Sequence, residues 1–219
     1  MREAAYHYNQ QILKIIGYSI LIGIPVLFIL LNASFYIIGI DLGGQENILL
    51  FFSNIMMFVL LSKPFHYLYT RCEQDEEVSL KEIIKNFFNS FGPILFMTLI
   101  VMACIYIGIV LFIIPGIILF PFVFLFPFTY ESNLTLKQWI RKTVTLHNEH
   151  VITVWIQILL WGSFLYLLWT GMLYLVTFLE MTPMVFAILK IIFCILVYPY
   201  IAFSISHKII ELSREEIVE

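Results

Sequence analysis

The pattern of apolar and polar positions is dominated by one long uncharged stretch. Residues 93–130 contain no Asp, Glu, Lys, Arg or His. Because one helical crossing of a bilayer needs about 20 apolar residues, this stretch is long enough for about two crossings. Pro115 and Gly116 interrupt it, and a Pro-Gly pair is a turn signal in which proline sets the first position and glycine accepts the positive φ that follows. The stretch therefore predicts a membrane hairpin that turns at Pro115 and Gly116.

Similar apolar segments occur along the rest of the chain. They predict membrane helices over residues 12–40, 48–69, 91–114, 116–130, 151–178 and 184–206. We expect a kink near Pro25, where a helical hydrogen bond is lost. The fourth segment has about 14 apolar residues, which rise only roughly 21 Å, and it contains Pro121 and Pro127. For this segment we expect a kinked helix that packs against its neighbours.

Two charged segments flank the central hairpin. In the first, Ser79 and Glu82 have the spacing of a capping box and precede an apolar pair. This predicts a short amphipathic helix at the membrane interface over about residues 79–90, and a second is predicted over about 135–148. Residues 79–85 (SLKEIIK) also resemble residues 135–141 (TLKQWIR) position by position, which is a weak internal repeat. Internal repeats are common in transporters.

Composition sets the fold class. Hydrophobic residues make up 61% of the 219 residues and charged residues only 12%, whereas a soluble domain has about 25% charged residues. We therefore predict an all-α, polytopic transmembrane helical bundle. Residues 1–219 form a single transmembrane domain of about six helices, arranged as three hairpins with short interfacial helices. No part of the chain remains for a separate soluble catalytic domain.

The basic residues predict the orientation. Of the 12 Lys and Arg residues, all except Lys190 lie at the termini or in alternate connections of a six-helix arrangement. By the positive-inside rule that side is cytoplasmic, which predicts a cell-membrane protein with both termini inside. A five-helix arrangement, with residues 117–130 as a re-entrant segment, would place residues 131–150 on the opposite side.

The second basic segment is the best candidate for an interaction surface. It contains Lys137, Trp139, Arg141 and Lys142. Basic residues near anionic headgroups contribute about 1 kcal/mol each, so anchoring to membrane lipids is one interpretation. Docking to a cytoplasmic partner, such as an ATPase subunit, is the other.

A few polar residues lie inside the apolar segments. Lys190 either extends its ammonium group to the interface or meets a buried partner or substrate. Asn32, Asn54 and Gln157 are expected to form hydrogen bonds between helices. No pair of carboxylates lies at membrane depth, which argues against a proton- or sodium-coupled pump.

His147 and His150 have the i, i+3 spacing of half a metal site on a helix. Zinc needs three or four ligands, and no further cluster of ligand residues accompanies these two. We expect them to be polar residues at headgroup level, and we predict no cofactor and no nucleic-acid partner.

The run at residues 113–131 (IIPGIILFPFVFLFPFTYE), followed by a capped basic helix and another apolar hairpin, resembles uncharacterised bacterial six-helix membrane proteins. In YesL-like proteins a Phe-Pro segment leads into a basic helix, as Phe126-Pro127 leads here into Thr135-Leu-Lys137. In YciC-like proteins, which are related to the membrane domain of some glycerophosphodiester phosphodiesterases, the Ile-Pro-Gly turn resembles residues 114–116 and a Glu resembles Glu131. The resemblance covers about residues 79–160. It implies an accessory protein of a bacterial inner membrane, sometimes associated with transport systems, and it supplies no catalytic residues.

These observations leave two functional hypotheses. The first is a non-enzymatic membrane protein, an accessory, scaffold or immunity-type component that acts through protein partners or lipids. The alternative is a permease subunit of an ABC-type transporter or exporter for a small or amphipathic substrate. A permease should have a water-accessible cavity lined by Asn32, Asn54, Gln157 or Lys190, whereas a scaffold should be closed and dry. An intramembrane lipid enzyme is disfavoured, because no nucleophile–base pair or metal set is visible.

Overall fold

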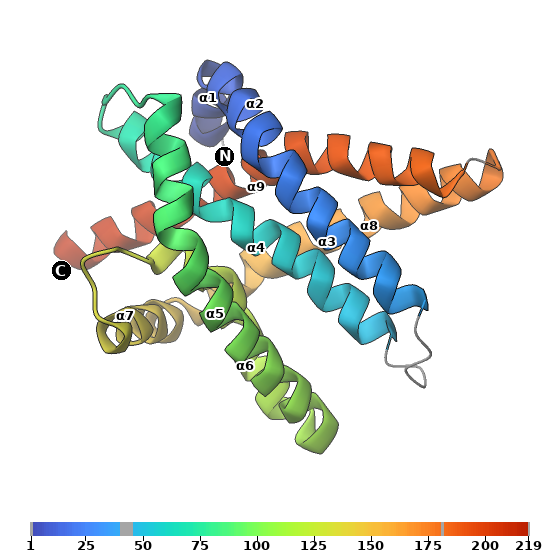
Figure 1. The fold of residues 1–219 in the computed structure, drawn as a ribbon. Helices are drawn as coiled ribbons and strands as arrows, with labels where there is room; N and C mark the ends of the chain where they lie inside the picture. The colour runs from blue at the N-terminus through green and yellow to red at the C-terminus, as the bar shows by residue number, and fades with distance from the viewer. Residues whose placement is uncertain (1, 40–45, 181, 219) are drawn as a thin grey trace.

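Most of the chain that the structure describes is helical. The computed structural model describes residues 2–39, 46–180 and 182–218 (Figure 1). These residues form helices and no strand, which confirms the all-α prediction. In order, the elements are α1 (Arg2–Gln10), α2 (Ile12–Tyr18), the π-helical turn η1 (Ser19–Gly23), α3 (Ile24–Gly39), α4 (Glu46–Glu73), α5 (Leu80–Phe112), α6 (Ile114–Thr129), α7 (Leu136–Glu149), α8 (Val151–Phe178) and α9 (Pro183–Val218).

Five helical segments in the described residues are long and apolar enough to cross a membrane: Ile12–Ile37, Ile48–Glu73, Leu80–Leu111, Val151–Val176 and Met184–Leu212. Helix α6 is apolar but has only 16 residues, so it rises about 24 Å against a hydrocarbon core of about 30 Å. The five long apolar helices are compatible with the multi-pass membrane character predicted from the sequence.

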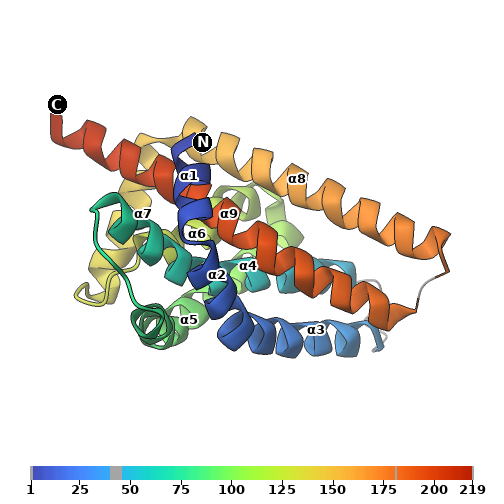
Figure 2. The same ribbon diagram turned by 90° about the horizontal axis from the view of Figure 1, so that it is seen from above.

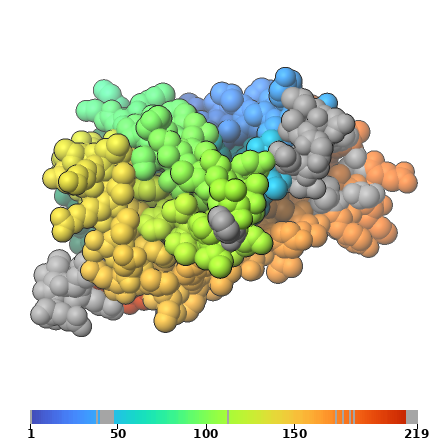
Figure 3. Space-filling view, turned by 90° about the horizontal axis from the view of Figure 1, so that it is seen from below, coloured from blue at the N-terminus to red at the C-terminus, as the bar shows by residue number. Residues whose placement is uncertain are grey.

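The helices form pairs that diverge from one another (Figure 1). The pairs are α2–α3 with α4, α5 with α6, and α8 with α9. Helix α1 lies across α9 (Figure 2). Figure 3 shows the outer surface of the α5–α6 hairpin in green, and the exposed apolar side chains near the tip of this hairpin are Ile107, Val110, Leu111, Ile113, Ile114 and Ile117. Hydrocarbon can cover such a surface without the penalty that water would impose.

Helix α4 is at the centre of the packing. It contacts α3, α5, α6 and α9, and it is the most buried of the candidate spans. Aromatic rings meet edge to face around it, with centroid distances of 5.2 Å for Tyr18–Phe65 and 5.4 Å for Tyr69–Phe203. Because lipid is as apolar as these side chains, close packing of this kind is what holds membrane helices together.

The central hairpin exists, but its turn differs from the prediction. The residue with positive φ is Ile113, at 50°, and Gly116 already lies inside α6. Pro115 occupies the first turn of α6, where its missing N–H costs no helical bond. Gly116 is needed for a different reason: a Cβ there would lie 2.6 Å from Ile109 Cγ1 and 3.0 Å from the Ile105 carbonyl oxygen. The glycine therefore permits α6 to pack closely against α5.

The predicted interfacial helix over residues 79–90 is not separate from the next helix. Both belong to α5, which begins with the predicted capping box: the Ser79 hydroxyl accepts from the Glu82 N–H, and the Glu82 carboxylate accepts from the Ser79 N–H. Pro93 does not break this helix. It leaves the Asn89 carbonyl without its usual donor, and the Tyr130 hydroxyl donates to that oxygen at 3.4 Å.

Other helix limits also differ from the predictions. Helices α4 and α9 continue beyond residues 69 and 206, where ends were expected. The irregularity expected near Pro25 is the π-helical turn η1, which ends two residues before it. Helix α7 is a separate helix, and Thr135 and Gln138 form its capping box.

Candidate functional site

A cavity of about 720 Å³ lies where α4, α6, α7 and α9 meet. Its volume is within the range of about 300–1,000 Å³ that is common for ligand pockets. Four cationic side chains line it, Lys63 and Arg71 from α4 and Arg141 and Lys142 from α7. Glu131, just after α6, is the one acidic residue among its described lining residues. We call this site the cationic cavity.

The ion pairs in the cationic cavity leave part of its positive charge without a protein partner. Lys142 pairs with Glu131, and Arg71 pairs with Glu76. Within the described residues, neither Lys63 Nζ nor the Arg141 guanidinium makes a hydrogen bond or an ion pair. Lys63 is only 8% exposed, so its ammonium group has little access to bulk water, whereas Arg141 is exposed. The cavity thus holds an excess of positive charge.

Helix α7 places its basic residues by its register. Gln138, Arg141, Lys142 and Thr145 line the cavity, and their spacing of three to four residues puts them on one face of the helix. Lys137 is exposed and is not part of this lining. Residues 137–142 were predicted to form one basic surface, whereas the structure separates Lys137 from Arg141 and Lys142.

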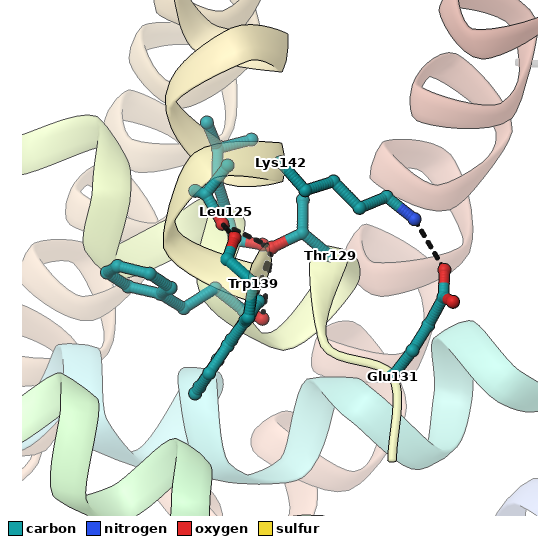
Figure 4. A network of polar contacts seen from close by, with 7 residues as sticks. Leu125, Thr129, Glu131, Trp139 and Lys142 are labelled. Carbon is teal, nitrogen blue, oxygen red and sulfur yellow. Dashed lines mark hydrogen bonds and ion pairs between the residues drawn. The ribbon is translucent and has the colours of Figure 1, made fainter. Parts of the chain in front are cut away.

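Trp139 is not a surface residue, which corrects its assignment to the interaction surface. It is 2% exposed, and its indole Nε1 donates to Thr129 Oγ1 at 3.2 Å. The Thr143 hydroxyl lies 2.7 Å from the same oxygen and donates to the Trp139 carbonyl at 2.9 Å. Figure 4 shows this network together with the Lys142–Glu131 pair. Trp139 therefore holds α7 against the end of α6 and orients the basic face of α7 toward the cavity.

Histidines occupy several positions around this end of the bundle. His66, which lines the cavity, has Nδ1 3.0 Å from Ser206 Oγ, and His207 Nδ1 lies 2.9 Å from the Tyr69 hydroxyl. His147 packs its ring against Phe122 at 4.8 Å, and burial lowers its pKa. In the described parts of the chain, no three His, Cys, Asp or Glu side chains form a group that could hold a metal, so His147 and His150 are not joined by the further ligands that zinc needs.

Lys190 is buried and has two partly buried partners. Its Nζ donates to Asn54 Oδ1 at 2.6 Å and lies 5.3 Å from the centroid of the Trp169 ring, and the residue is 8% exposed. Of the two interpretations of Lys190, the structure favours the buried partner over extension to the interface. The site joins α4, α8 and α9, which no sequence spacing could reveal.

The remaining polar candidates do not join Lys190. Asn32 is exposed and donates to the Phe28 carbonyl of its own helix at 2.7 Å, so the interhelical bond predicted for it is wrong. The hydroxyls of Ser34 and Ser53, 2.7 Å apart, make such a contact between α3 and α4 instead. Gln157 lines a small cavity of about 30 Å³, and its buried Oε1 has no hydrogen-bond partner among the described residues.

Comparisons of the chain with protein-family models, with curated proteins and with solved structures found no match.

Proposed function

We propose that this chain is a non-enzymatic, multi-pass protein of a bacterial cell membrane, an accessory or scaffold component that acts by binding a partner at the cationic cavity. The partner contributes an anionic group, carried either by a membrane lipid or by a neighbouring protein. The observation that carries the proposal is the unpaired positive charge of Lys63 and Arg141 in a cavity of ligand size.

Electrostatics supports this proposal. Burying a charged group without a partner is costly, and proteins normally compensate such charges with ion pairs or hydrogen bonds. Glu131, the carboxylate that lines the cavity, pairs with Lys142 and also acts electrostatically on Lys63, so one carboxylate serves two cations. A bound anion would compensate the buried charge of Lys63, and the exposed guanidinium of Arg141 would pair with the same anion.

The distribution of charge supports the membrane orientation in the proposal. The ends of α4 and α6, represented by Arg71 and Thr129, line the same cavity as α7. The end of α9 lies there too, because His207 contacts Tyr69. The basic connections of the chain therefore share one end of the bundle, and by the positive-inside rule we assign that end to the cytoplasm. The resemblance to YesL-like and YciC-like proteins is the basis for assigning the chain to a bacterial inner membrane.

Native mass spectrometry tests the proposal. The full chain is extracted from its own membrane in mild detergent, in parallel with the double variant Lys63→Gln/Arg141→Gln. We expect the wild-type protein to carry a stoichiometric lipid or partner protein that the double variant loses. A wild-type protein that carries neither, or a variant that keeps the same companion, would contradict the proposal.

A permease subunit is the second candidate, and the buried contact of Lys190 with Asn54 and Trp169 favours it. A polar group at this depth is a common feature of substrate pathways. Cys194, one turn after Lys190 and 2% exposed, reports on water access to this region. With Cys72 and Cys104 replaced by Ser, labelling of Cys194 by a membrane-impermeant thiol reagent would support a permease. Protection of Cys194 in the folded protein, with labelling after denaturation, would support the scaffold.

A further inference from the structure

We infer that the cationic cavity binds the phosphate headgroup of an anionic membrane lipid, with Lys63 and Arg141 as the phosphate ligands. This inference rests on the proposed function, because it names the chemistry of the anion for the same cavity. The partner is then a lipid of the bilayer. Among the basic residues of α7, Arg141 binds its phosphate and Lys137 does not.

The arrangement of donors suits a phosphate. Lys63 approaches from α4 and Arg141 from α7, so the two unpaired cations lie on different walls of the cavity. An arginine guanidinium can bind two phosphate oxygens with its fork of N–H groups, and a lysine adds a compact charge. Gln138 and Thr145, on the same face of α7 as Arg141, add neutral polar groups to that wall.

The remaining walls favour a lipid over a free anion. Phe128, Leu146, Ile209 and Ile210 give the cavity an apolar side next to its charged side. Ile209 also lines the small cavity near Gln157, whose other walls are mostly apolar side chains of α6, α8 and α9. A molecule with an anionic head and an apolar tail can contact both the charged wall and the apolar wall of the cationic cavity. A soluble phosphate would contact only the charged wall.

The position along the helices agrees with a headgroup site. Lys63 lies within the span Ile48–Glu73, and Ile209 lies near the end of the span Met184–Leu212. At this level α4 and α9 each change from an apolar segment to a charged one. Lipid phosphates lie at this boundary between the hydrocarbon core and water. Basic pockets between transmembrane helices on the cytoplasmic side are a recognised way to bind anionic headgroups.

The test measures the lipid preference of the full-length protein by native mass spectrometry. The purified chain is titrated in mild detergent with phosphatidylglycerol or with phosphatidylcholine of the same acyl chains. We expect the wild-type protein to retain phosphatidylglycerol at least tenfold more strongly. Arg141→Gln should weaken this binding about fivefold, the factor that corresponds to about 1 kcal/mol for one charge near a headgroup, and Lys63→Gln should weaken it more because Lys63 is buried.

Lys137→Gln is the matched control, because it removes one positive charge from the same helix outside the cavity lining. It should leave phosphatidylglycerol binding unchanged. An equal loss in Lys137→Gln and Arg141→Gln would overturn the inference in favour of general surface attraction. The absence of a preference for phosphatidylglycerol in the wild-type protein would also overturn it.

Two further outcomes separate this inference from the proposed function. Displacement of bound phosphatidylglycerol by soluble glycerol 3-phosphate at equal concentration would overturn the lipid assignment, because the apolar wall would then contribute nothing. A stoichiometric protein partner that Lys63→Gln and Arg141→Gln release, in the absence of any lipid preference, would overturn the inference while the proposed function stands. Thermal unfolding of each variant, with a midpoint close to that of the wild-type protein, establishes that the loss of binding is not a loss of folding.

Discussion

A side-chain atom added where α5 and α6 pack against each other should destabilise the bundle. Gly116→Ala is the substitution that adds such an atom with the shortest contact. The new Cβ would lie 2.6 Å from Ile109 Cγ1 and 3.0 Å from both the Ile105 carbonyl oxygen and the Ile109 amide nitrogen. The Ile109 side chain can rotate, but the backbone atoms of α5 cannot move away unless the hairpin opens. The same argument holds from the other helix, since a Cβ on Gly108 would lie 2.8 Å from the Gly116 amide nitrogen.

The change in the free energy of unfolding for Gly116→Ala follows from two opposing effects. Replacing glycine by alanine inside a helix normally stabilises it by up to about 1 kcal/mol. Overpacking a well-packed contact costs about 1–3 kcal/mol, and the cost is at the upper end where rigid backbone is involved. We therefore expect Gly116→Ala to lower the free energy of unfolding by about 1–2 kcal/mol. For a chain of this size, that lowers the thermal midpoint by roughly 2–8 °C.

The assay is thermal unfolding in mild detergent, followed by circular dichroism. Gly162→Ala is the matched control, because it lies inside the long helix α8 and a Cβ there meets nothing within 4 Å. It should be neutral or slightly stabilising, and Gly108→Ala should behave like Gly116→Ala. If Gly116→Ala and Gly162→Ala have the same midpoint, the close packing of α5 on α6 is not what these glycines provide.

Three further predictions concern buried polar groups. Asn54→Ala should destabilise the fold by about 2–4 kcal/mol, because it leaves the buried ammonium of Lys190 without its acceptor at 2.6 Å. Lys190→Met should destabilise the fold much less, because it removes the charge itself. Thermal midpoints measure both effects. Trp139→Ala should lower the free energy of unfolding by about 3–5 kcal/mol and release α7, because the indole is buried and donates to Thr129, and protease sensitivity of residues 131–150 reports the release. Because burial lowers the pKa of His147 below its unfolded value of about 6.5, the unfolded chain binds the proton more readily, so His147 reduces stability as the pH falls below about 6.5; unfolding midpoints at pH 7.5 and 5.5 measure this loss.

Each of these predictions has a control in the same chain. Asn32→Ala should be nearly neutral, since Asn32 is exposed and bonds only to its own helix; a cost equal to that of Asn54→Ala would contradict the role of Lys190. Ile140→Ala, on the exposed side of α7, should leave that helix protected, and release of α7 by this variant would refute the special role of Trp139. His147→Phe should make the midpoints at the two pH values more similar, and an unchanged pH dependence would show that other groups cause it.

The candidate site shows which of its residues can be predicted from the sequence and which cannot. Arg141 and Lys142 were identified from their charge in a capped amphipathic helix, and the structure places both at the cavity. Lys63 was interpreted only as part of a basic connection, because a charge beside a proline at the end of an apolar run is typical of a helix end. Trp139 was assigned to a surface since tryptophan often marks the interface. Its burial depends on Thr129 in another helix, which the sequence does not bring close.

The sequence by itself determined the all-helical membrane character, most helix positions and the capping boxes at Ser79 and Thr135, because these depend on local hydrophobicity and on hydrogen bonds between residues three apart. Only the tertiary structure decided that Lys190 meets Asn54, that Gly116 serves packing rather than the turn at Ile113, and that four helices surround a cavity with unpaired positive charge. These features depend on contacts between residues far apart in the chain. In an apolar sequence nearly every face of a helix can meet either lipid or protein, so the hydrophobic pattern does not reveal which side chains face each other.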